Sequence, residues 1–180
     1  MRNWLIDTGF TLGDGTVIDV KPLEALLKLT STELTVCPQL KPIHLSCHGP
    51  ERQNVKLAAN LISRTVGTAL VHYKPGGDKK LADDCGKFIL LMNEWFDLMN
   101  VYTTNKYSIP SQIAYGLQLD EQNLLLSKIR DVILHMRCRG KTCLQIFQKG
   151  ILMGITALIM MKKLEKFYKN SVYLACLNIE

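Results

Sequence analysis

The feature that most constrains the fold is the helical spacing of apolar residues in two long stretches of the chain. In residues 51–73 these apolar residues, three or four positions apart, are Val55, Ala58, Ile62, Val66 and Ala69. In the second stretch they are Cys85, Phe88, Met92, Phe96 and Met99. Such spacing places the side chains on one face of an α-helix. We therefore expect two amphipathic helices, the first of about five turns.

The other segments add helices and loops. Pro22–Leu29 is expected to form a short helix with proline in its first turn. A helix capped by Asp120 is expected to end near Gly140, and the longest helix is expected to span Leu144–Lys169. Residues 1–20 and 30–47 favour irregular structure, with a turn in the first and short extended pieces in the second.

The last ten residues, 171–180, are rich in β-branched and apolar residues, which is typical of a strand. A single strand needs a partner that the rest of this chain hardly supplies, which indicates that the chain is cut from a larger protein. The predicted fold class is therefore mainly α, a helical domain with long loops and a C-terminal strand that belongs with another domain.

The positive charge of the chain is concentrated in its last third. Residues 1–60 and 61–120 each hold six basic and six acidic residues, whereas residues 121–180 hold ten basic and four acidic residues. A basic surface there could contact nucleic acid or another polyanion, and the basic trio Arg137, Arg139 and Lys141 supplies candidate contacts. A solvated basic face without a partner explains the same pattern.

The cysteines give little support to metal or disulfide chemistry. No secretory signal opens the chain, so reduced and mostly buried thiols of an intracellular protein are expected. Cys37, His44, Cys47 and His48 are of metal-ligand type, but their spacing matches no common zinc-finger pattern. The longest apolar run, Ile151–Met161, has eleven residues, and crossing a bilayer takes roughly 20, so no membrane span is expected.

Two motifs resemble nucleotide-binding loops without matching them. RGKT (Arg139–Thr142) ends like a P-loop, but a histidine replaces the required first glycine, and a predicted helix precedes the motif where a strand is needed. NKYS (Asn105–Ser108) lacks the acid that accepts two guanine N–H groups in the Asn-Lys-x-Asp motif of guanine-specific nucleoside triphosphatases. Asn93, Asp97 and Asn100 form one polar stripe on the second predicted helix, and Asp97 could supply that carboxylate. No residue set for hydrolytic catalysis stands out.

Two segments resemble one known family. RQNVKLAANLISRTVGTAL (Arg52–Leu70) and FILLMNEWFDLMN (Phe88–Asn100) resemble successive motifs of P element transposases and their THAP-domain-containing transposase relatives. The weaker landmarks GDGTVI and LKPIHL precede these motifs, and FQKGILMGITALIMMKKL and YLACLNIE follow them. The resemblance spans most of the chain, and its order and spacing are coherent.

The resemblance implies a helical GTP-binding domain inserted into an RNase H-like catalytic domain. Residues 1–20 would connect from the RNase H-like domain, residues 21–170 would form the insertion domain, and residues 171–180 would start the returning strand. The resemblance also implies that GTP, with Mg²⁺, is an assembly cofactor for binding transposon-end DNA and is not hydrolysed. The expected partners are GTP, this DNA and the RNase H-like domain of the same or a related chain, in the nucleus.

Matched residue by residue, the family pattern implies a nucleotide site made of Asn54, Val55, Ser63, Asp97 and Asn100. Asp97 would face the guanine edge, and Lys41 and Glu180 would contact the nucleotide or a metal ion, although no metal site is complete in the isolated chain. Each nucleotide candidate also has a structural explanation. Asn54 would be a helix-end polar group, Ser63 a small residue for helix packing, and Asp97 with Asn100 an ordinary helix edge.

The chain departs from the family pattern in several places. Gln39 stands where the family often has a lysine, and Arg52 or Gln53 replaces the lysine that starts the first motif. The catalytic glutamate would lie beyond Glu180, so the chain alone is not expected to cut or join DNA. Two further hypotheses remain open. One is a domesticated or degenerate helical protein-interaction module that has lost GTP, and the other is a nuclease that uses a partner's carboxylates.

Overall fold

The computed structural model describes residues 1–31, 36–100, 113, 115–142 and 145. The chain divides into two compact units, Met1–Gly140 and Lys141–Glu180. Apart from residue 145, the helix predicted for Leu144–Lys169 lies outside the described residues, and so does the strand predicted for 171–180.

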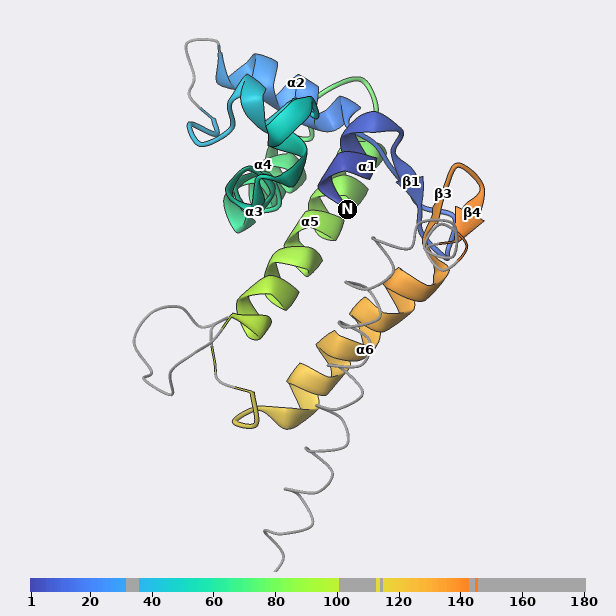
Figure 1. Cartoon of the computed structure of the whole chain (residues 1–180). Coiled ribbons are helices and arrows are strands. Elements are labelled where there is room, and N and C mark those ends of the chain that lie inside the picture. Colours follow the sequence, from blue (N-terminus) through green and yellow to red (C-terminus); the bar gives the residue numbers. More distant parts are fainter. Residues whose placement is uncertain (32–35, 101–112, 114, 143–144, 146–180) are drawn as a thin grey trace, which may run out of the picture. The chain divides into compact units, whose positions relative to one another are not determined.

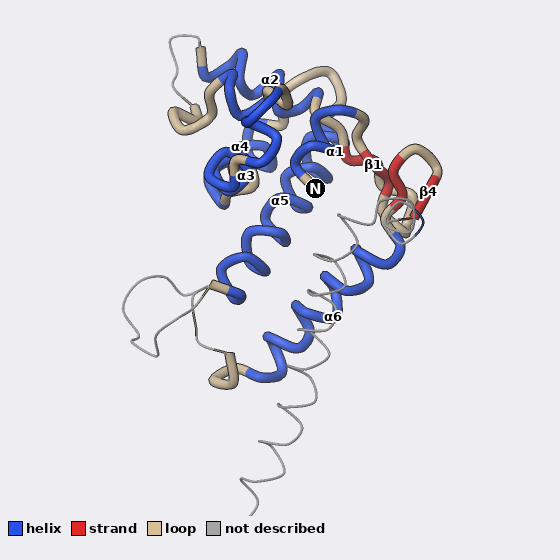
Figure 2. Tube along the Cα trace, viewed as in Figure 1, coloured by secondary structure: helices blue, strands red, loops and turns tan. Residues whose placement is uncertain are grey.

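The described part is mostly helical with a small antiparallel sheet, which confirms the mainly α prediction (Figures 1 and 2). The α-helices are α1 (Arg2–Asp7), α2 (Lys21–Thr30), α3 (Val55–Leu61), α4 (Arg64–Tyr73), α5 (Lys79–Met99) and α6 (Leu119–His135). Two 3₁₀ helices are η1 (Pro42–Leu45) and η2 (Gly49–Gln53). The strands are β1 (Phe10–Thr11), β2 (Val17–Ile18), β3 (Arg137–Cys138) and β4 (Lys141–Thr142).

The sheet joins the two ends of the first unit. β1 pairs antiparallel with β2, where Phe10 faces Ile18, and also antiparallel with β3, where Thr11 faces Arg137. The predicted turn between β1 and β2 forms, and within it Asp14 Oδ1 accepts a hydrogen bond from the Thr16 backbone N–H at 2.9 Å. The irregular structure predicted for residues 1–20 is otherwise wrong, because α1, β1 and β2 form there. A helix of six residues and strands of two are too short to leave a clear periodic pattern.

The single helix of about five turns predicted within residues 51–73 is wrong, because the chain breaks between α3 and α4. Ser63 has an extended backbone, with φ −116° and ψ 157°, and its side chain accepts a hydrogen bond from the Val66 N–H at 3.5 Å. Serine favours such a cap because its hydroxyl replaces the missing backbone acceptor of the first turn. The apolar spacing continues across the break, so periodicity alone does not detect it.

The core is centred on the crossing of α4 and α5, where two glycines face each other. A Cβ atom at Gly86 would lie 2.7 Å from Val71 Cγ2 and 2.9 Å from the Gly67 carbonyl oxygen. Phe10 packs edge-on against Phe88, with ring centroids 5.1 Å apart, and so attaches the sheet to α5. Completely or almost completely buried side chains around these contacts include Leu23, Leu26, Leu61, Leu70, Ile89 and Ile129.

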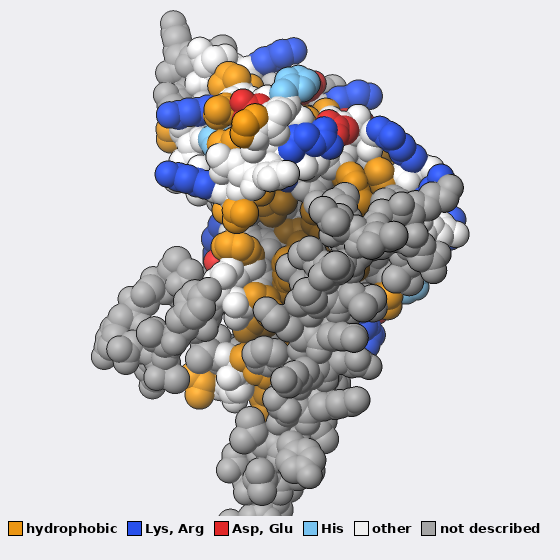
Figure 3. All heavy atoms as spheres, in the orientation of Figure 1, with side chains coloured by type: hydrophobic (Ala, Val, Ile, Leu, Met, Phe, Trp, Pro, Cys, Tyr) orange, Lys and Arg blue, Asp and Glu red, His pale blue; other side chains and the backbone are white. Residues whose placement is uncertain are grey.

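The apolar stripe predicted on α5 is buried only in its first part. Cys85, Phe88 and Met92 are buried, whereas Phe96 and Met99 are 43% and 40% exposed. On the face of the molecule that Figure 3 draws, hydrophobic side chains gather along α5. The last turn of α5 therefore leaves apolar surface accessible among the described residues.

The helix predicted to start at Asp120 and stop at Gly140 forms with different ends. α6 starts at Leu119, and Asp120 lies inside its first turn, where a carboxylate suits the helix dipole. The helix ends at His135, and Gly140 lies in the two-residue turn between β3 and β4. Arg139 and Gly140 both have positive φ, 53° and 74°, as a tight hairpin turn requires.

The prediction of buried thiols is confirmed for the four cysteines among the described residues. These are Cys37, Cys47, Cys85 and Cys138, and all four are free and buried. Among the same described residues, no helix combines the length and the hydrophobicity that a membrane crossing takes.

Candidate nucleotide-binding site

A buried arginine organises the loop that leads into α3. The Arg2 side chain is 4% exposed, and its Nη1 donates to the Glu51 carbonyl oxygen at 3.0 Å. Its Nε and Nη2 donate to the His44 carbonyl oxygen at 3.2 and 3.0 Å, and Nη2 also donates to the Ser46 carbonyl oxygen. These bonds hold residues 43–51 against α1. The guanidinium is therefore occupied by backbone acceptors and serves the loop rather than an anion.

His44 is the second buried polar residue of this loop. Its Nδ1 accepts a hydrogen bond from the Lys41 backbone N–H at 2.9 Å, and its Nε2 lies 3.4 Å from Asn60 Nδ2. Burial, together with the Arg2 charge, lowers the pKa of His44, so the ring is neutral at neutral pH. His44 is thus a structural residue, and no group of three or more metal-ligating side chains occurs among the described residues.

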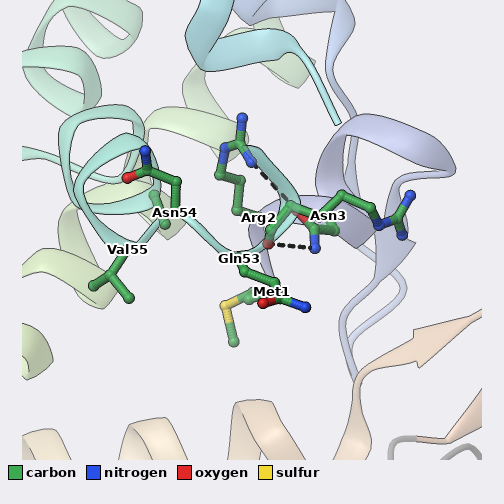
Figure 4. A pocket seen from close by; sticks show the side chains of 8 residues that line it. Met1, Arg2, Asn3, Gln53, Asn54 and Val55 are labelled. Carbon is green, nitrogen blue, oxygen red and sulfur yellow. Dashed lines mark hydrogen bonds between the residues drawn. The ribbon is translucent and has the colours of Figure 1, made fainter. Parts of the chain in front are cut away.

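A small pocket lies where α1 meets the start of α3 (Figure 4). Its volume is about 190 Å³, and its lining residues are Met1, Arg2, Asn3, Arg52, Gln53, Asn54, Val55 and Ala58. Pockets that bury most of a drug-sized ligand measure roughly 300–1,000 Å³, so this one can enclose only part of a nucleotide. None of the described residues that line the pocket is acidic, which suits an anionic or hydrogen-bonding part of the ligand.

Asn54 and Val55, two of the predicted contacts, both line this pocket. The Asn54 side chain accepts a hydrogen bond from the Leu57 N–H at 3.2 Å and so caps α3. Val55 is 72% exposed, although its place in the apolar spacing suggested burial. Both residues are thus accessible at the start of α3, where first-turn N–H groups have no intrahelical acceptor.

Asp97, a further predicted contact, is linked through Asn93 to Arg64, the residue that follows the predicted contact Ser63 at the start of α4. Asn93 Oδ1 accepts a hydrogen bond from the Arg64 backbone N–H at 3.1 Å. Asn93 Nδ2 donates to Asp97 Oδ2 at 2.9 Å. Asn93 therefore faces the start of α4 and holds the Asp97 carboxylate, which is half-buried.

Asn93 belongs to the polar stripe, but the sequence does not single it out as a nucleotide contact. The stripe is the available signal, whereas the hydrogen bond to Arg64 joins residues 29 positions apart and leaves no local pattern. Asn100, the last member of the stripe, donates from Nδ2 to the Phe96 carbonyl oxygen at 2.8 Å and ends α5. Asn100 is exposed and remains accessible to a ligand.

The other predicted contacts are distributed over the chain. Lys41 is exposed just before η1, and Arg137, Arg139 and Lys141 are exposed on the β3–β4 hairpin and its turn. Glu180 lies outside the described residues.

Comparison with known proteins places this geometry in context. Residues 1–111 match the family described as TNP-like, GTP-binding insertion domain. The chain is 30% identical over 159 residues to the Transposable element P transposase of Drosophila melanogaster, a match that covers 88% of the chain and 21% of that protein. The fold resembles the solved Drosophila P element transposase strand transfer complex, with a TM-score of 0.66, 30% identity, and coverage of 73% of this chain and 30% of that one.

Proposed function

Because this chain belongs to the family of TNP-like GTP-binding insertion domains of P element-type transposases, we propose that it binds GTP through Asp97 and the residues at the starts of α3 and α4. The observation that carries the proposal is the Asp97 carboxylate, held by Asn93 beside the start of α4. A carboxylate can accept hydrogen bonds from both N–H groups of the guanine edge at once. No other base presents two N–H groups in that pattern.

Asp97 can serve Asn93 and a ligand together. A carboxylate has about four lone-pair positions, so it can accept the hydrogen bond from Asn93 to Oδ2 and still accept hydrogen bonds from a ligand. Asn100, three residues further along α5, is the candidate for a further amide contact to the nucleotide. Ser63 is the candidate for a hydroxyl contact, in addition to capping α4.

Asn54 and Val55 would contact another part of the nucleotide. The first-turn N–H groups of α3 suit a phosphate oxygen or an acceptor atom of the base. Lys41 is exposed on the loop that Arg2 holds and would add a positive charge. The pocket at this position is too small for a whole nucleotide, which supports a ligand that extends along the surface.

GTP would act as an assembly cofactor without being hydrolysed. RGKT does not meet the P-loop pattern, and the described residues gather no set of three metal-ligating side chains. The described donors therefore do not fit a Mg²⁺ site held by the protein, and Mg²⁺ that accompanies GTP would be bound mainly by phosphate oxygens.

The proposed partners of the GTP-bound domain are transposon-end DNA and an RNase H-like domain of the same or a related chain. The chain covers only about a fifth of the Drosophila transposase, so cutting and joining would depend on residues outside this chain. The solved relative is a strand transfer complex, which supports a role on DNA. A location in the nucleus is part of the proposal. Arg137, Arg139 and Lys141 are the candidate phosphate contacts.

GTP-dependent stabilisation of the full 180-residue chain tests the proposal. A ligand at 100 times its Kd raises the free energy of unfolding by about 2.7 kcal/mol, so GTP should raise Tm where ATP does not. Asp97→Ala should abolish this rise while the protein stays folded. Glu94→Ala, which removes an exposed acid from the same helix, should leave it intact.

Calorimetry on the same sample decides between the two main hypotheses. No binding of a folded sample at millimolar GTP would contradict the proposal. That result would favour the alternative of a degenerate helical protein-interaction module that has lost the nucleotide.

A further inference from the structure

We propose that Asn93 is a positioning residue for guanine recognition, because it fixes the Asp97 carboxylate and joins it to the start of α4. This inference rests on the proposed function, since it requires that Asp97 contacts the base. Asn93 itself would act through Asp97 rather than through the nucleotide.

The two hydrogen bonds of Asn93 determine the orientation of its side-chain amide. The Arg64 backbone N–H can only donate, so the Asn93 atom 3.1 Å away is the oxygen. The ionised Asp97 carboxylate can only accept, so the Asn93 atom 2.9 Å away is the nitrogen. Both ends of the amide are thus used, and only one orientation satisfies both partners.

Few other side chains could make this pair of contacts. Aspartate retains an acceptor for the Arg64 N–H but has no donor for Asp97 when ionised. Alanine loses both bonds. Asparagine has one donor and one acceptor at a fixed spacing, which matches a backbone N–H on α4 and a carboxylate on α5.

The fixed carboxylate matters because guanine presents two parallel N–H donors. Rotation of the Asp97 side chain would keep one of these hydrogen bonds and break the other, which weakens discrimination between bases. A contact that holds one rotamer in advance lowers the ordering cost of binding. Asn93 would therefore contribute to selectivity for guanine more than to stability of the fold.

Asn93→Asp in the full chain separates these two roles. The variant keeps the acceptor for the Arg64 N–H, so α4 should still begin at the same residue. It removes the donor to Asp97 and places a second carboxylate beside it, which repels the first. Calorimetry with GTP and with inosine triphosphate, which lacks the 2-amino group, measures the selectivity of the wild type and of the variant.

The wild type should bind GTP about tenfold or more tightly than inosine triphosphate, since a hydrogen bond to a charged group is lost with the amino group. In Asn93→Asp this ratio should fall toward one, and GTP affinity should fall about tenfold, with Tm close to that of the wild type. Asn93→Ala should lose both selectivity and some stability, because it also removes the acceptor for Arg64.

A matched control is Asn123→Asp on α6. Asn123 Oδ1 accepts a hydrogen bond from the Tyr115 hydroxyl at 2.8 Å, and aspartate keeps that acceptor while adding the same charge. This variant should bind both nucleotides like the wild type. If Asn93→Asp keeps the wild-type preference for GTP, the inference is wrong and the proposed function stands. If the wild type binds no GTP, both fail together.

Discussion

Arg2 and His44 are neighbouring buried residues with different roles in the same loop. The Arg2 side chain donates to backbone carbonyl oxygens of the loop between residues 43 and 51. Burial and the nearby Arg2 guanidinium lower the pKa of His44, which keeps its ring neutral at neutral pH. The stability of this loop therefore depends on the hydrogen bonds of Arg2 and on a neutral His44.

Arg2→Ala should destabilise the fold more than its distance from the helical core suggests. The substitution leaves buried carbonyl oxygens such as that of His44 without a donor, at a cost of about 2–5 kcal/mol in the free energy of unfolding. Chemical denaturation measures the difference. Arg52→Ala removes a partly exposed ion pair with Asp7 and should cost less than about 1 kcal/mol. Equal effects of the two variants would contradict the assignment of Arg2.

The lowered pKa of His44 gives the fold a pH dependence. The unfolded state takes up the histidine proton near pH 6.5, where the folded state does not, so stability is present above about pH 6.5 and is lost as the pH falls toward the folded-state pKa. One proton limits the slope to about 1.4 kcal/mol per pH unit. His44→Gln should remove this component from denaturation curves measured between about pH 5 and 7.5, whereas substitution of the exposed His72 should not.

Some of these polar side chains could be singled out from the sequence and others could not, for physical reasons. Asp97 could be predicted because the polar stripe on a helix is a local pattern. Arg2 could not, because its carbonyl partners lie more than 40 positions away. Asn93 belongs to the polar stripe, which the sequence shows. Its hydrogen bond from the Arg64 backbone N–H leaves no pattern in the sequence.

At the scale of elements, the close crossing of α4 and α5 depends on the absence of side chains at Gly67 and Gly86. Each glycine lies against the other helix, where a Cβ atom would come within 3.1 Å of the opposing carbonyl oxygen. From sequence alone Gly67 only lowers the helix propensity of its segment, because propensity describes a helix without its neighbour. The structure shows the packing reason for its presence.

Gly86→Ala should therefore destabilise the fold although alanine favours helix by about 1 kcal/mol. The new Cβ would lie 2.7 Å from Val71 Cγ2 and 2.9 Å from the Gly67 carbonyl oxygen, and overpacking of this kind typically costs about 1–3 kcal/mol in the free energy of unfolding. Thermal denaturation compares it with Gly77→Ala in the loop before α5, where no atom lies within 4 Å of the added Cβ. A Gly86→Ala protein as stable as the wild type would show that the helices can separate without cost.

The break between α3 and α4 shows why the existence of helices is predictable and their bounds are not. The apolar intervals across residues 55–69 run over both helices, although Val66 and Ala69 are buried and Val55 is exposed. Two successive helices therefore fit the same spacing as one. The serine cap decides the outcome through a single hydrogen bond. Such a local competition is invisible to a periodicity that is averaged over many residues.

At the scale of the whole molecule, the uneven charge of the sequence suggests a basic surface for DNA. Replacing Arg137, Arg139 and Lys141 together with alanine should weaken DNA binding. The slope of log affinity against log salt concentration should become shallower by about 0.9 for each phosphate that the variant no longer neutralises. Titrations at several salt concentrations provide the measurement, with GTP present throughout.

A control for total charge is the triple alanine variant of three exposed lysines in the first two thirds of the chain, Lys21, Lys28 and Lys79. Its net charge equals that of the hairpin variant, so a general decrease in attraction would affect both alike. If the salt slope falls equally in both variants, the hairpin makes no specific phosphate contacts.

The hydrogen bonds of Arg2 and the pairing of β1 with β3 also bear on where residues can be removed from this domain or inserted into it. A gene trimmed to begin at Lys21 would delete the donor for residues 43–51 and the strand that pairs with β3, so its product should be degraded rapidly by proteases. An inserted peptide should be accepted best at the turn near Gly15, which is exposed and has open space around it. The first twenty residues would then behave as part of the folding unit, with one permissive position within them.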